Sequence, residues 1–179
     1  MQVISGKCSD GFRLKDHVKE DTKIVKFVDF DTSEVKDMSY MFYQCNNVEL
    51  IEGLDCFDTS KVENMSYMFK QYQGIFYDYE INKWDVSNVK NMDEMFEGIC
   101  PSWYLDFTNP PEHYYQRIKF DLRDWKTPKL ESARSMFESC SELKEIRLDN
   151  FGCSKNLRDI SNMFYYADDL EFILQTILN

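Results

Sequence analysis

Short apolar clusters recur along the chain at nearly equal intervals. The dipeptide Met-Phe begins at Met41, Met68, Met95, Met136 and Met163, so the intervals are 27, 27, 41 and 27 residues. Because 41 equals 27 plus 14, this spacing indicates an array of 27-residue units with one 14-residue insertion before the fourth unit.

The residues before each Met-Phe pair repeat in register. Residues 30–35 are FDTSEV, 57–62 are FDTSKV and 84–89 are WDVSNV. The fourth copy is reduced to WKTPKL at 125–130, and the fifth begins at Phe151 with one extra residue. The agreement predicts a repeat protein in which every unit has the same local structure.

The second half of each unit, for example 60–71, has apolar residues at positions i, i+3, i+6 and i+7. This spacing predicts a short amphipathic helix. Ser33, Ser60 and Ser87 stand where the N-cap of that helix belongs, since a hydroxyl there can accept from the first N–H groups.

Between the predicted helices lie β-rich runs with the L-x-x-L-x-L spacing of a leucine-rich repeat strand, at 76–84 and 143–151. In the first of these runs the spacing assigns Tyr79 and Ile81 to the inward face. The run in the second unit departs from the spacing, because Glu52 falls on an inward position, and we expect a local irregularity there.

One strand and one helix of this length cannot bury an apolar face alone, so we expect the units to stack and close a continuous core. Equivalent residues then form ladders: Val35, Val62, Val89, Leu130 and Leu157; Met38, Met65, Met92, Ala133 and Ile160; and the five Met-Phe methionines. Eight of the nine methionines thereby belong to the predicted core. A methionine-rich groove for a partner is the alternative.

The chain is expected to divide into an N-terminal cap at 1–23, containing a helix or turn at 11–22, and a single repeat domain at 24–179. Residues 170–179 are expected to add a sixth strand as a C-terminal cap. An uncovered apolar end of such a stack invites edge pairing, so a homodimer through that end is a further hypothesis.

The phrase FDTSKVENMSYMF at 57–69, with close copies at 30–42 and 84–96, resembles the signature of BspA-type leucine-rich repeat surface proteins. The resemblance covers about residues 24–174. It implies an α/β repeat fold, a right-handed leucine-rich-repeat-like solenoid of about five units. Members of this family are mostly bacterial surface proteins, often lipoproteins, implicated in adhesion to host proteins, so the resemblance also implies an adhesin-like role.

The net charge of the chain argues against some classes of binding partner. The 179 residues include 32 acidic and 21 basic side chains, which gives a net charge of −11. Phosphate backbones repel such a chain, so direct binding of nucleic acid is not expected. No apolar run approaches 18 residues, so no transmembrane segment is expected. The N-terminus lacks the apolar core of a signal peptide, which predicts a cytoplasmic protein as written, or a cell-surface protein if a leader was removed.

The sequence offers no catalytic constellation. It contains no Gly-rich phosphate loop, no G-x-S-x-G and no HExxH motif, and its only histidines are His17 and His113. The six cysteines form no CxxC pair, so we predict no metal site, no cofactor and no enzymatic activity. The ladder of Asp31, Asp58 and Asp85 could bind calcium, but we prefer local turns in which each carboxylate accepts backbone hydrogen bonds.

The insertion, at about 99–116, contains three of the four prolines and five aromatic residues. Those aromatic residues are Trp103, Tyr104, Phe107, Tyr114 and Tyr115. Long loops on rigid scaffolds often carry binding residues, and Trp and Tyr are favoured anchors. The alternative is that the aromatic side chains fold back and seal the flank of the repeat domain.

The outer strand face is the second candidate surface. Its predicted members are Tyr77, Glu80, Lys119, Asp121 and Arg147. The mixture of charges fits either a protein-binding face or plain solvated strands. The sequence therefore predicts a non-enzymatic protein-binding module that uses this face and the insertion.

One alternative function follows from the acidic charge. A small acidic intracellular inhibitor or adaptor could present carboxylates where phosphates would bind, as in a phage-type antagonist of a host nucleic-acid-handling defence enzyme.

Overall fold

The computed structural model describes residues 1–99 and 119–174. Its elements in chain order are β1 (Gln2–Lys7), the 3-10 helix η1 (Leu14–Asp16), β2 (Ile24–Asp31), β3 (Leu50–Glu52), the 3-10 helix η2 (Leu54–Cys56), α1 (Asp78–Ile81), β4 (Lys119–Asp121), β5 (Glu145–Arg147) and β6 (Phe172–Leu174).

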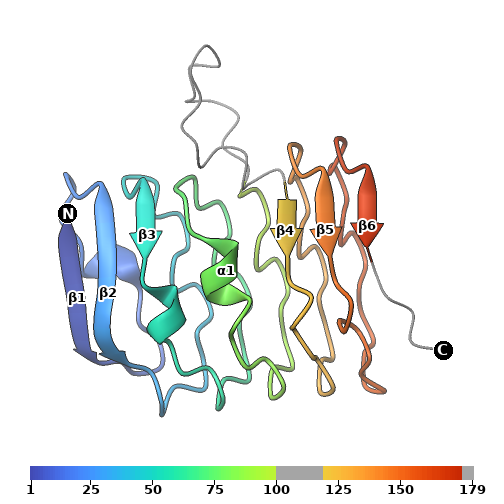
Figure 1. Cartoon of the computed structure of the whole chain (residues 1–179), viewed down its shortest axis with the longest axis horizontal. Coiled ribbons are helices and arrows are strands. Elements are labelled where there is room, and N and C mark those ends of the chain that lie inside the picture. The colour runs from blue at the N-terminus through green and yellow to red at the C-terminus, as the bar shows by residue number, and fades with distance from the viewer. Residues whose placement is uncertain (100–118, 175–179) are drawn as a thin grey trace.

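The strands form two parallel three-stranded sheets, β1-β2-β3 and β4-β5-β6. Val25 pairs with Ile51, and Ile146 pairs with Ile173, so these residues are 26 and 27 positions apart, close to the 27-residue repeat. Figure 1 shows the strands side by side along the long axis, with α1 between β3 and β4. Each circuit of the chain, here called a coil and numbered by its Met-Phe pair, stacks on the next.

The strand expected at 76–84 does not form, because α1 occupies its place. The tryptophans that follow α1 and β4 help to fix this geometry. The indole N–H of Trp84 donates to the carbonyl of Leu54 (2.8 Å), and that of Trp125 donates to the carbonyl of Ile81 (2.9 Å). Both indoles are buried, so these bonds hold η2 and α1 against the coil that follows each of them.

The irregularity expected near Glu52 takes a definite form. Ile51 is the buried residue of β3, and Glu52 is half-buried. Gly53 follows with φ of 83° and leads into η2. A Cβ on Gly53 would lie 2.3 Å from the carbonyl oxygen of Phe27, so only glycine fits this position.

The short helices expected in the second half of each unit are also absent, and tight turns replace them. Alternate N–H groups point to the next coil. In coil two, the N–H groups of Met65, Tyr67, Phe69 and Gln71 donate to the carbonyls of Asn91, Asp93, Met95 and Glu97 at 2.7–2.9 Å. The intervening N–H groups bond locally, as from Lys70 to Tyr67. An α-helix would direct all of these donors inward along its own axis, so it could not make this contact.

Each coil makes its turns with two residues in the left-handed region, four positions apart. The first set is Tyr40, Tyr67, Glu94, Ser135 and Asn162, with φ of 55–60°, and the second is Gln44, Gln71, Gly98, Ser139 and Tyr166, with φ of 51–64°. The Met-Phe pair lies between them. The apolar spacing that predicts a helix is therefore produced by a repeating turn.

The aspartates that precede these segments serve their own turns. Asp31, Asp58 and Asp85 each accept the N–H of the residue two positions later, at 3.0, 3.0 and 2.9 Å. The serines at those positions are thus donors within Asx turns and not helix N-caps.

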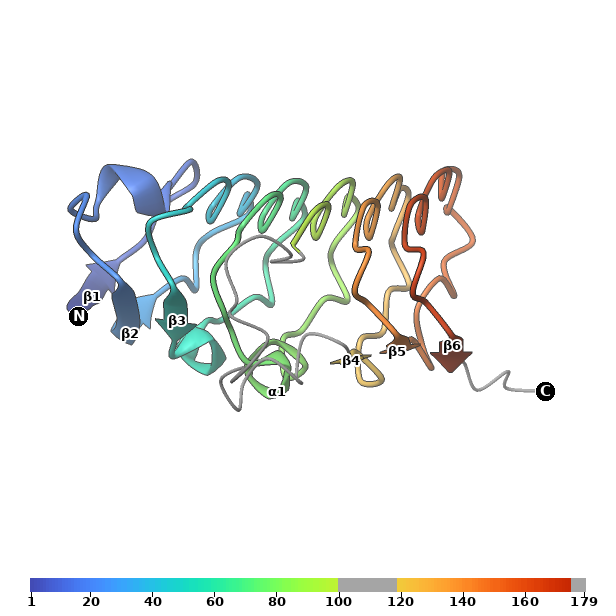
Figure 2. The same ribbon diagram turned by 90° about the horizontal axis from the view of Figure 1, so that it is seen from above.

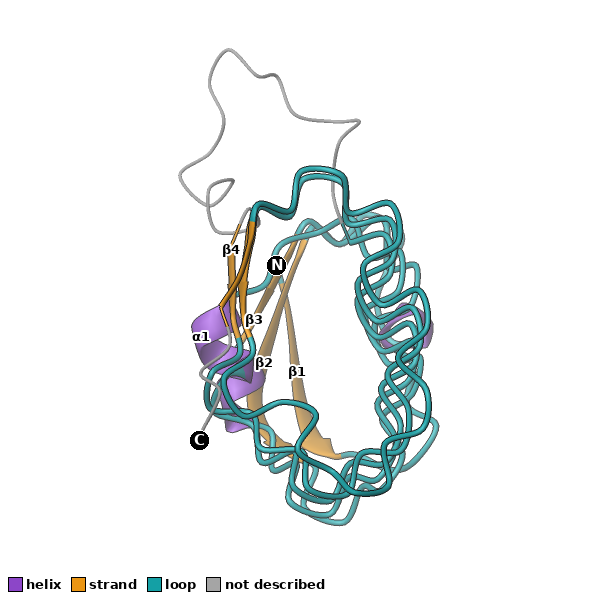
Figure 3. Ribbon diagram, turned by 90° about the vertical axis from the view of Figure 1, so that its right-hand side faces the viewer, coloured by secondary structure: helices purple, strands orange, loops and turns teal. Residues whose placement is uncertain are grey.

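The core lies between the strand side and the turn side, which face each other in the view along the stack (Figure 3). The predicted valine and methionine ladders are buried through the first four coils. Beside them the rings of Phe42, Phe69, Phe96, Phe137 and Phe164 stack at centroid distances of 4.8, 5.5, 5.3 and 5.6 Å. In coil five the core ladders reach solvent, where Ile160 is 53% exposed.

The N-terminal cap replaces a missing coil. In coil two the N–H of Glu63 donates to the carbonyl of Lys36, one coil earlier (2.8 Å). Coil one has no such neighbour, and the carboxylate of Asp10 accepts the N–H groups of Lys36 and Asp37 instead, at 2.8 and 3.0 Å. The cap includes β1, a strand that sequence reasoning missed.

Removal of this carboxylate tests the role of the cap. Asp10→Ala should lower the free energy of unfolding at pH 7 by about 1 kcal/mol, and Asp10→Asn, which keeps an acceptor oxygen, by less. Hydrogen bonds from Asp37 and Lys36 lower the pKa of Asp10. The contribution is therefore complete above the ordinary carboxyl pKa and fades as pH falls through the lowered one. Urea unfolding at neutral and acid pH measures it; an equal difference at both would contradict the prediction.

The left-handed positions give a pair of opposite predictions. Gly98→Ala should cost about 1 kcal/mol, because φ there is 64° and its Cβ would meet only the Gln71 side chain at 3.5 Å. Ser139→Gly, at the equivalent exposed position one coil later, should gain about 0.5 kcal/mol. Urea unfolding of both variants checks the signs, and two changes of the same sign would contradict the turn geometry.

Candidate functional site

The outer strand side carries a protrusion. Helix α1 interrupts the row of strands and lies on their outer side, as Figure 3 shows. It packs against η2 on one flank and β4 on the other. We call η2, α1 and the adjoining Tyr77 the α1 ridge.

Glu80 fixes the α1 ridge in place. The sequence assigned this residue to the outer face, which is wrong, since Glu80 is only 6% exposed. Its carboxylate accepts the N–H groups of Gly53 and Leu54, at 3.2 and 2.9 Å. Burial raises its pKa, and the two backbone donors oppose that rise. Glu80 is therefore a positioning residue that joins α1 to η2.

Tyr79 is the exposed part of the α1 ridge. Its side chain is 54% exposed, and its ring stacks on Tyr77 at 5.2 Å between centroids. Partial burial raises the pKa of both phenols, and nearby carboxylates, among them Glu52 and Glu80, add to the rise. Sequence reasoning named Tyr77 and missed Tyr79, because the strand pattern placed Tyr79 inside and the helix turns it outward.

The charged members of the predicted face lie next to the α1 ridge. Lys119 and Asp121 are on β4, and Arg147 on β5 pairs in register with Asp121. The carboxylate of Asp78 on α1 accepts the N–H of Asp121 at 3.4 Å, which links the ridge to β4. Lys119 pairs with Glu145 at 2.8 Å. The structure thus brings together Lys119, Asp121 and Arg147, whereas Tyr77 lies beside Tyr79 and near the carboxylates of Glu52 and Glu80.

The aromatic residues of the insertion lie outside the described residues. They are Trp103, Tyr104, Phe107, Tyr114 and Tyr115.

The turn side carries a charged network that sequence reasoning missed. Lys70 pairs with Glu94 (2.5 Å) and with Glu97, and Arg134 also pairs with Glu94 (2.9 Å). Burial lowers the pKa of Lys70, but hydrogen bonds with the two glutamates hold it above its ordinary value. The sequence contained a signal for this network, because residues of opposite charge one repeat apart, such as Lys70 and Glu97, are expected to lie side by side in adjacent coils. The network satisfies its own charges and ties three coils together.

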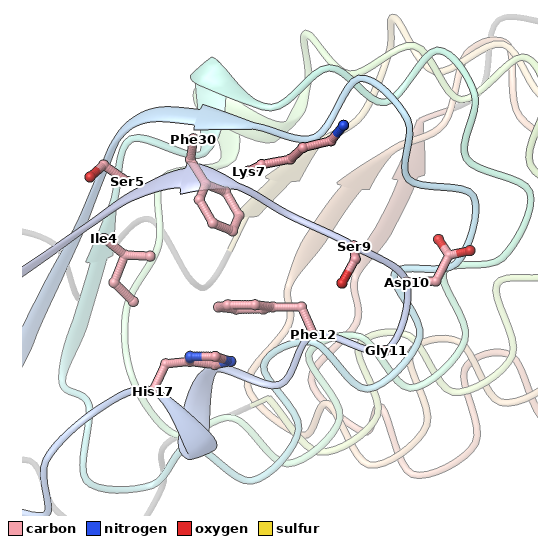
Figure 4. Close-up of a pocket in the computed structure, with 9 residues that line it drawn as sticks. All are labelled: Ile4, Ser5, Lys7, Ser9, Asp10, Gly11, Phe12, His17 and Phe30. Atoms are coloured by element: carbon pink, nitrogen blue, oxygen red, sulfur yellow. The ribbon is translucent and has the colours of Figure 1, made fainter.

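A cavity of about 330 Å³ opens in the N-terminal cap, between β1 and the turn that follows it (Figure 4). It is lined by Ile4, Ser5, Lys7, Ser9, Asp10, Gly11, Phe12, His17 and Phe30. The His17 ring stacks on Phe12 at 4.4 Å. Asp10 already bonds the backbone of coil one, so this carboxylate is engaged in holding the cap.

Cysteine thiols are buried in the core. Burial raises the pKa of the Cys8 and Cys45 thiols to about 11, so both are protonated at neutral pH. Within 1–99 and 119–174, no three His, Cys, Asp or Glu side chains are grouped so as to hold a metal ion. In the same part of the chain, no helix is long and apolar enough to cross a membrane.

A family model matches most of the chain. The family model described as "Mycoplasma protein of unknown function, DUF285" matches residues 11–109 and 111–176. Neither the curated proteins nor the solved structures include a match.

The role of Glu80 can be measured directly. Glu80→Ala should lower the free energy of unfolding by about 2–3 kcal/mol, because two backbone donors at a buried site lose their acceptor. The control is Glu145→Ala, which removes an ion pair from the surface and should cost less than about 1 kcal/mol. Chemical denaturation of the two variants compares them. Similar losses would show that Glu80 does not hold the α1 ridge.

Proposed function

The chain belongs to the DUF285 family of Mycoplasma proteins of unknown function, and from this premise we propose that it is a non-enzymatic protein-binding module. Binding uses the outer strand side, with the α1 ridge at its centre. In this proposal the stacked coils are a right-handed leucine-rich-repeat-like solenoid, and the chain performs no chemistry on its partner.

Two observations support the proposed fold. The sequence phrase at 57–69 and its copies resemble BspA-type repeats. Paired residues are 26 positions apart between β2 and β3 and between β4 and β5, and 27 apart between β5 and β6, as in Val25 with Ile51 and Ile146 with Ile173. A solenoid of stacked repeats has this register, and its strands make an extended binding surface.

The single observation that carries the function is the exposed aromatic pair on the α1 ridge. Tyr79 offers a large amphipathic ring to solvent, and Tyr77 stacks against it from behind. Tyrosine is enriched among interface residues that dominate binding energy, since it buries a large area with few rotatable bonds. Glu80 holds the ridge at its base, so the ring is presented on a fixed support.

The proposed face extends from the ridge over β4 and β5. Lys119, Asp121 and Arg147 supply polar groups of both signs, which suits the rim of a protein interface. The aromatic residues of the insertion, which lies between Ile99 and β4 in sequence, are proposed as further anchors.

Two kinds of partner fit the proposal. The resemblance to BspA-type proteins favours an extracellular protein and an adhesin-like role. The net charge of −11 favours a basic intracellular partner, as expected of an acidic inhibitor of a nucleic-acid-handling enzyme. The compartment from which a partner is captured separates these two.

Tyr79→Ala provides the test. The parent chain and the variant are used to capture proteins from extracellular matrix and, separately, from cytosol, and each retained protein is purified and its Kd measured. We expect Kd to rise about tenfold or more for Tyr79→Ala, because loss of a central aromatic anchor costs about 1.4 kcal/mol or more. Tyr43→Ala, on the turn side, is the matched control and should leave Kd unchanged.

A second variant tests the insertion. Deletion of 103–115 should abolish capture while the thermal unfolding temperature stays as in the parent chain. Equal binding by the parent, Tyr79→Ala and the deletion would overturn the proposed site. Turnover of any small molecule by the purified chain would overturn the non-enzymatic proposal.

A further inference from the structure

Two stacked tyrosines on the turn side each have a cation of this chain over the ring. Tyr40 and Tyr67 stack at 4.5 Å between ring centroids. The Arg13 guanidinium lies 5.2 Å from the centroid of the Tyr40 ring, and the Lys70 ammonium lies 5.4 Å from that of Tyr67. The negative face of an aromatic ring attracts a positive charge, so each cation stabilises the ring that it covers.

The α1 ridge carries a second stacked pair, and its outer ring has no such cation. Tyr79 stacks on Tyr77, and Tyr79 is 54% exposed. Because Tyr77 covers one face of this ring, the exposed part of the ring includes its other face. Within residues 1–99 and 119–174, no Lys or Arg side chain lies over the Tyr79 ring. This ring can therefore accept a cation from another molecule.

Three carboxylates lie near the exposed ring. Glu52 ends β3, Asp55 lies on η2, and the carboxylate of Glu80 accepts the backbone N–H groups between them. Partial burial raises the pKa of Tyr79, and these three carboxylates raise it further. The phenol of Tyr79 is therefore neutral at pH 7, and its ring lies in a negative potential that favours a cation.

Two lysines offset part of this negative charge. Lys26 on β2 is in register with Glu52, and the Lys83 ammonium lies 4.0 Å from a carboxylate oxygen of Asp55. The side chains of Lys83 and Asp55 are 65% and 48% exposed, so their ion pair is weak and a partner can replace it. Glu80 makes no ion pair with any residue that the structure describes, and its acceptors are used by backbone N–H groups. The α1 ridge therefore keeps an excess of negative charge beside its aromatic ring.

We propose that the α1 ridge binds an arginine side chain of the partner protein, with the guanidinium over the exposed face of Tyr79 and next to the carboxylates of Glu52 and Asp55. This inference rests on the proposed function and names the chemistry of the partner's anchor. A guanidinium suits both parts of the site, since it stacks on aromatic faces and forms paired hydrogen bonds with a carboxylate. The net charge of −11 adds attraction at longer range for a basic partner.

A pair of peptides tests the proposal on the full chain. The probe is Gly-Gly-Arg-Gly-Gly with blocked termini, and the matched control peptide has citrulline, which is nearly the same shape and uncharged, in place of arginine. NMR titration gives Kd from the ring signals of Tyr79, which are identified by their loss in Tyr79→Leu. We expect the arginine peptide to bind about tenfold more tightly than the citrulline peptide.

Two charge variants separate the α1 ridge from general attraction to an acidic chain. Asp55→Asn and Glu34→Gln each remove one negative charge from an exposed carboxylate that pairs with a lysine, Lys83 or Lys61. Asp55→Asn should raise Kd of the arginine peptide about threefold, whereas Glu34→Gln, outside the ridge, should leave it nearly unchanged. Circular dichroism melts should show that all variants are folded.

Three results would overturn the proposal: no binding of the arginine peptide, equal binding of the two peptides, or equal effects of Asp55→Asn and Glu34→Gln. None of them would contradict the proposed function, because Tyr79 can anchor a captured protein without a cation over its ring. The proposed function fails on a different result, an unchanged Kd of the captured protein for Tyr79→Ala, so the two failures are distinguishable.

Discussion

The rest of the structure depends on the row of backbone hydrogen bonds that joins each coil to the next on the turn side. In coil one, the N–H groups of Met38, Tyr40, Phe42 and Gln44 donate to the carbonyls of Asn64, Ser66, Met68 and Lys70 in coil two. Each acceptor lies 26 positions after its donor, and coil two makes the same bonds to coil three. This contact fixes the length of a coil, because a unit of another length would place its carbonyls out of register. The 14-residue insertion is compatible with the stack since it lies outside this row, and Met92 still finds Ser132 at 2.9 Å.

Several side chains act to complete this backbone pattern where the repeat falters. Asp10 substitutes for the carbonyl of an absent coil. In coils two and three, the side chains of Asn64 and Asn91 accept the N–H of the residue two positions later. Coil four has Ser132 at this position, and there the carboxylate of Asp93 from coil three accepts the N–H of Arg134 instead (2.8 Å). On the strand side, the carboxylate of Glu80 likewise accepts backbone N–H groups, those of Gly53 and Leu54. Carboxylates in this acidic protein therefore carry a structural duty that a count of surface charges would miss.

The sequence predicts the period, the buried ladders and the position of the insertion, because each depends only on which residues recur at 27-residue spacing. It does not predict the turns. Apolar residues spaced three and four apart occur both in an amphipathic helix and in turns with left-handed residues such as Tyr67 and Gln71. Only the hydrogen bonds to the next coil favour the turns over the helix. The candidate site could not be predicted for the same reason. Because α1 replaces the expected strand, Tyr79 is exposed and Glu80 is buried, the reverse of the strand pattern. This change depends on tertiary hydrogen bonds of Gly53 and Trp84.

Because the two ends of the stack differ, local unfolding is expected to begin at one end of the molecule and not at the other. A linear array with only nearest-neighbour contacts opens from its weakest end, so we expect amide hydrogen exchange to be fastest in coil five and to slow toward the cap. The N–H groups of Ile160, Asn162, Phe164 and Tyr166 have no acceptor within the described residues, which lowers the barrier to peeling of that coil. We expect fraying to advance one repeat at a time until it reaches the ion pairs that Lys70 and Arg134 make with Glu94. We therefore expect the network on the turn side to separate a C-terminal part that opens readily from an N-terminal part, including the α1 ridge, that opens rarely.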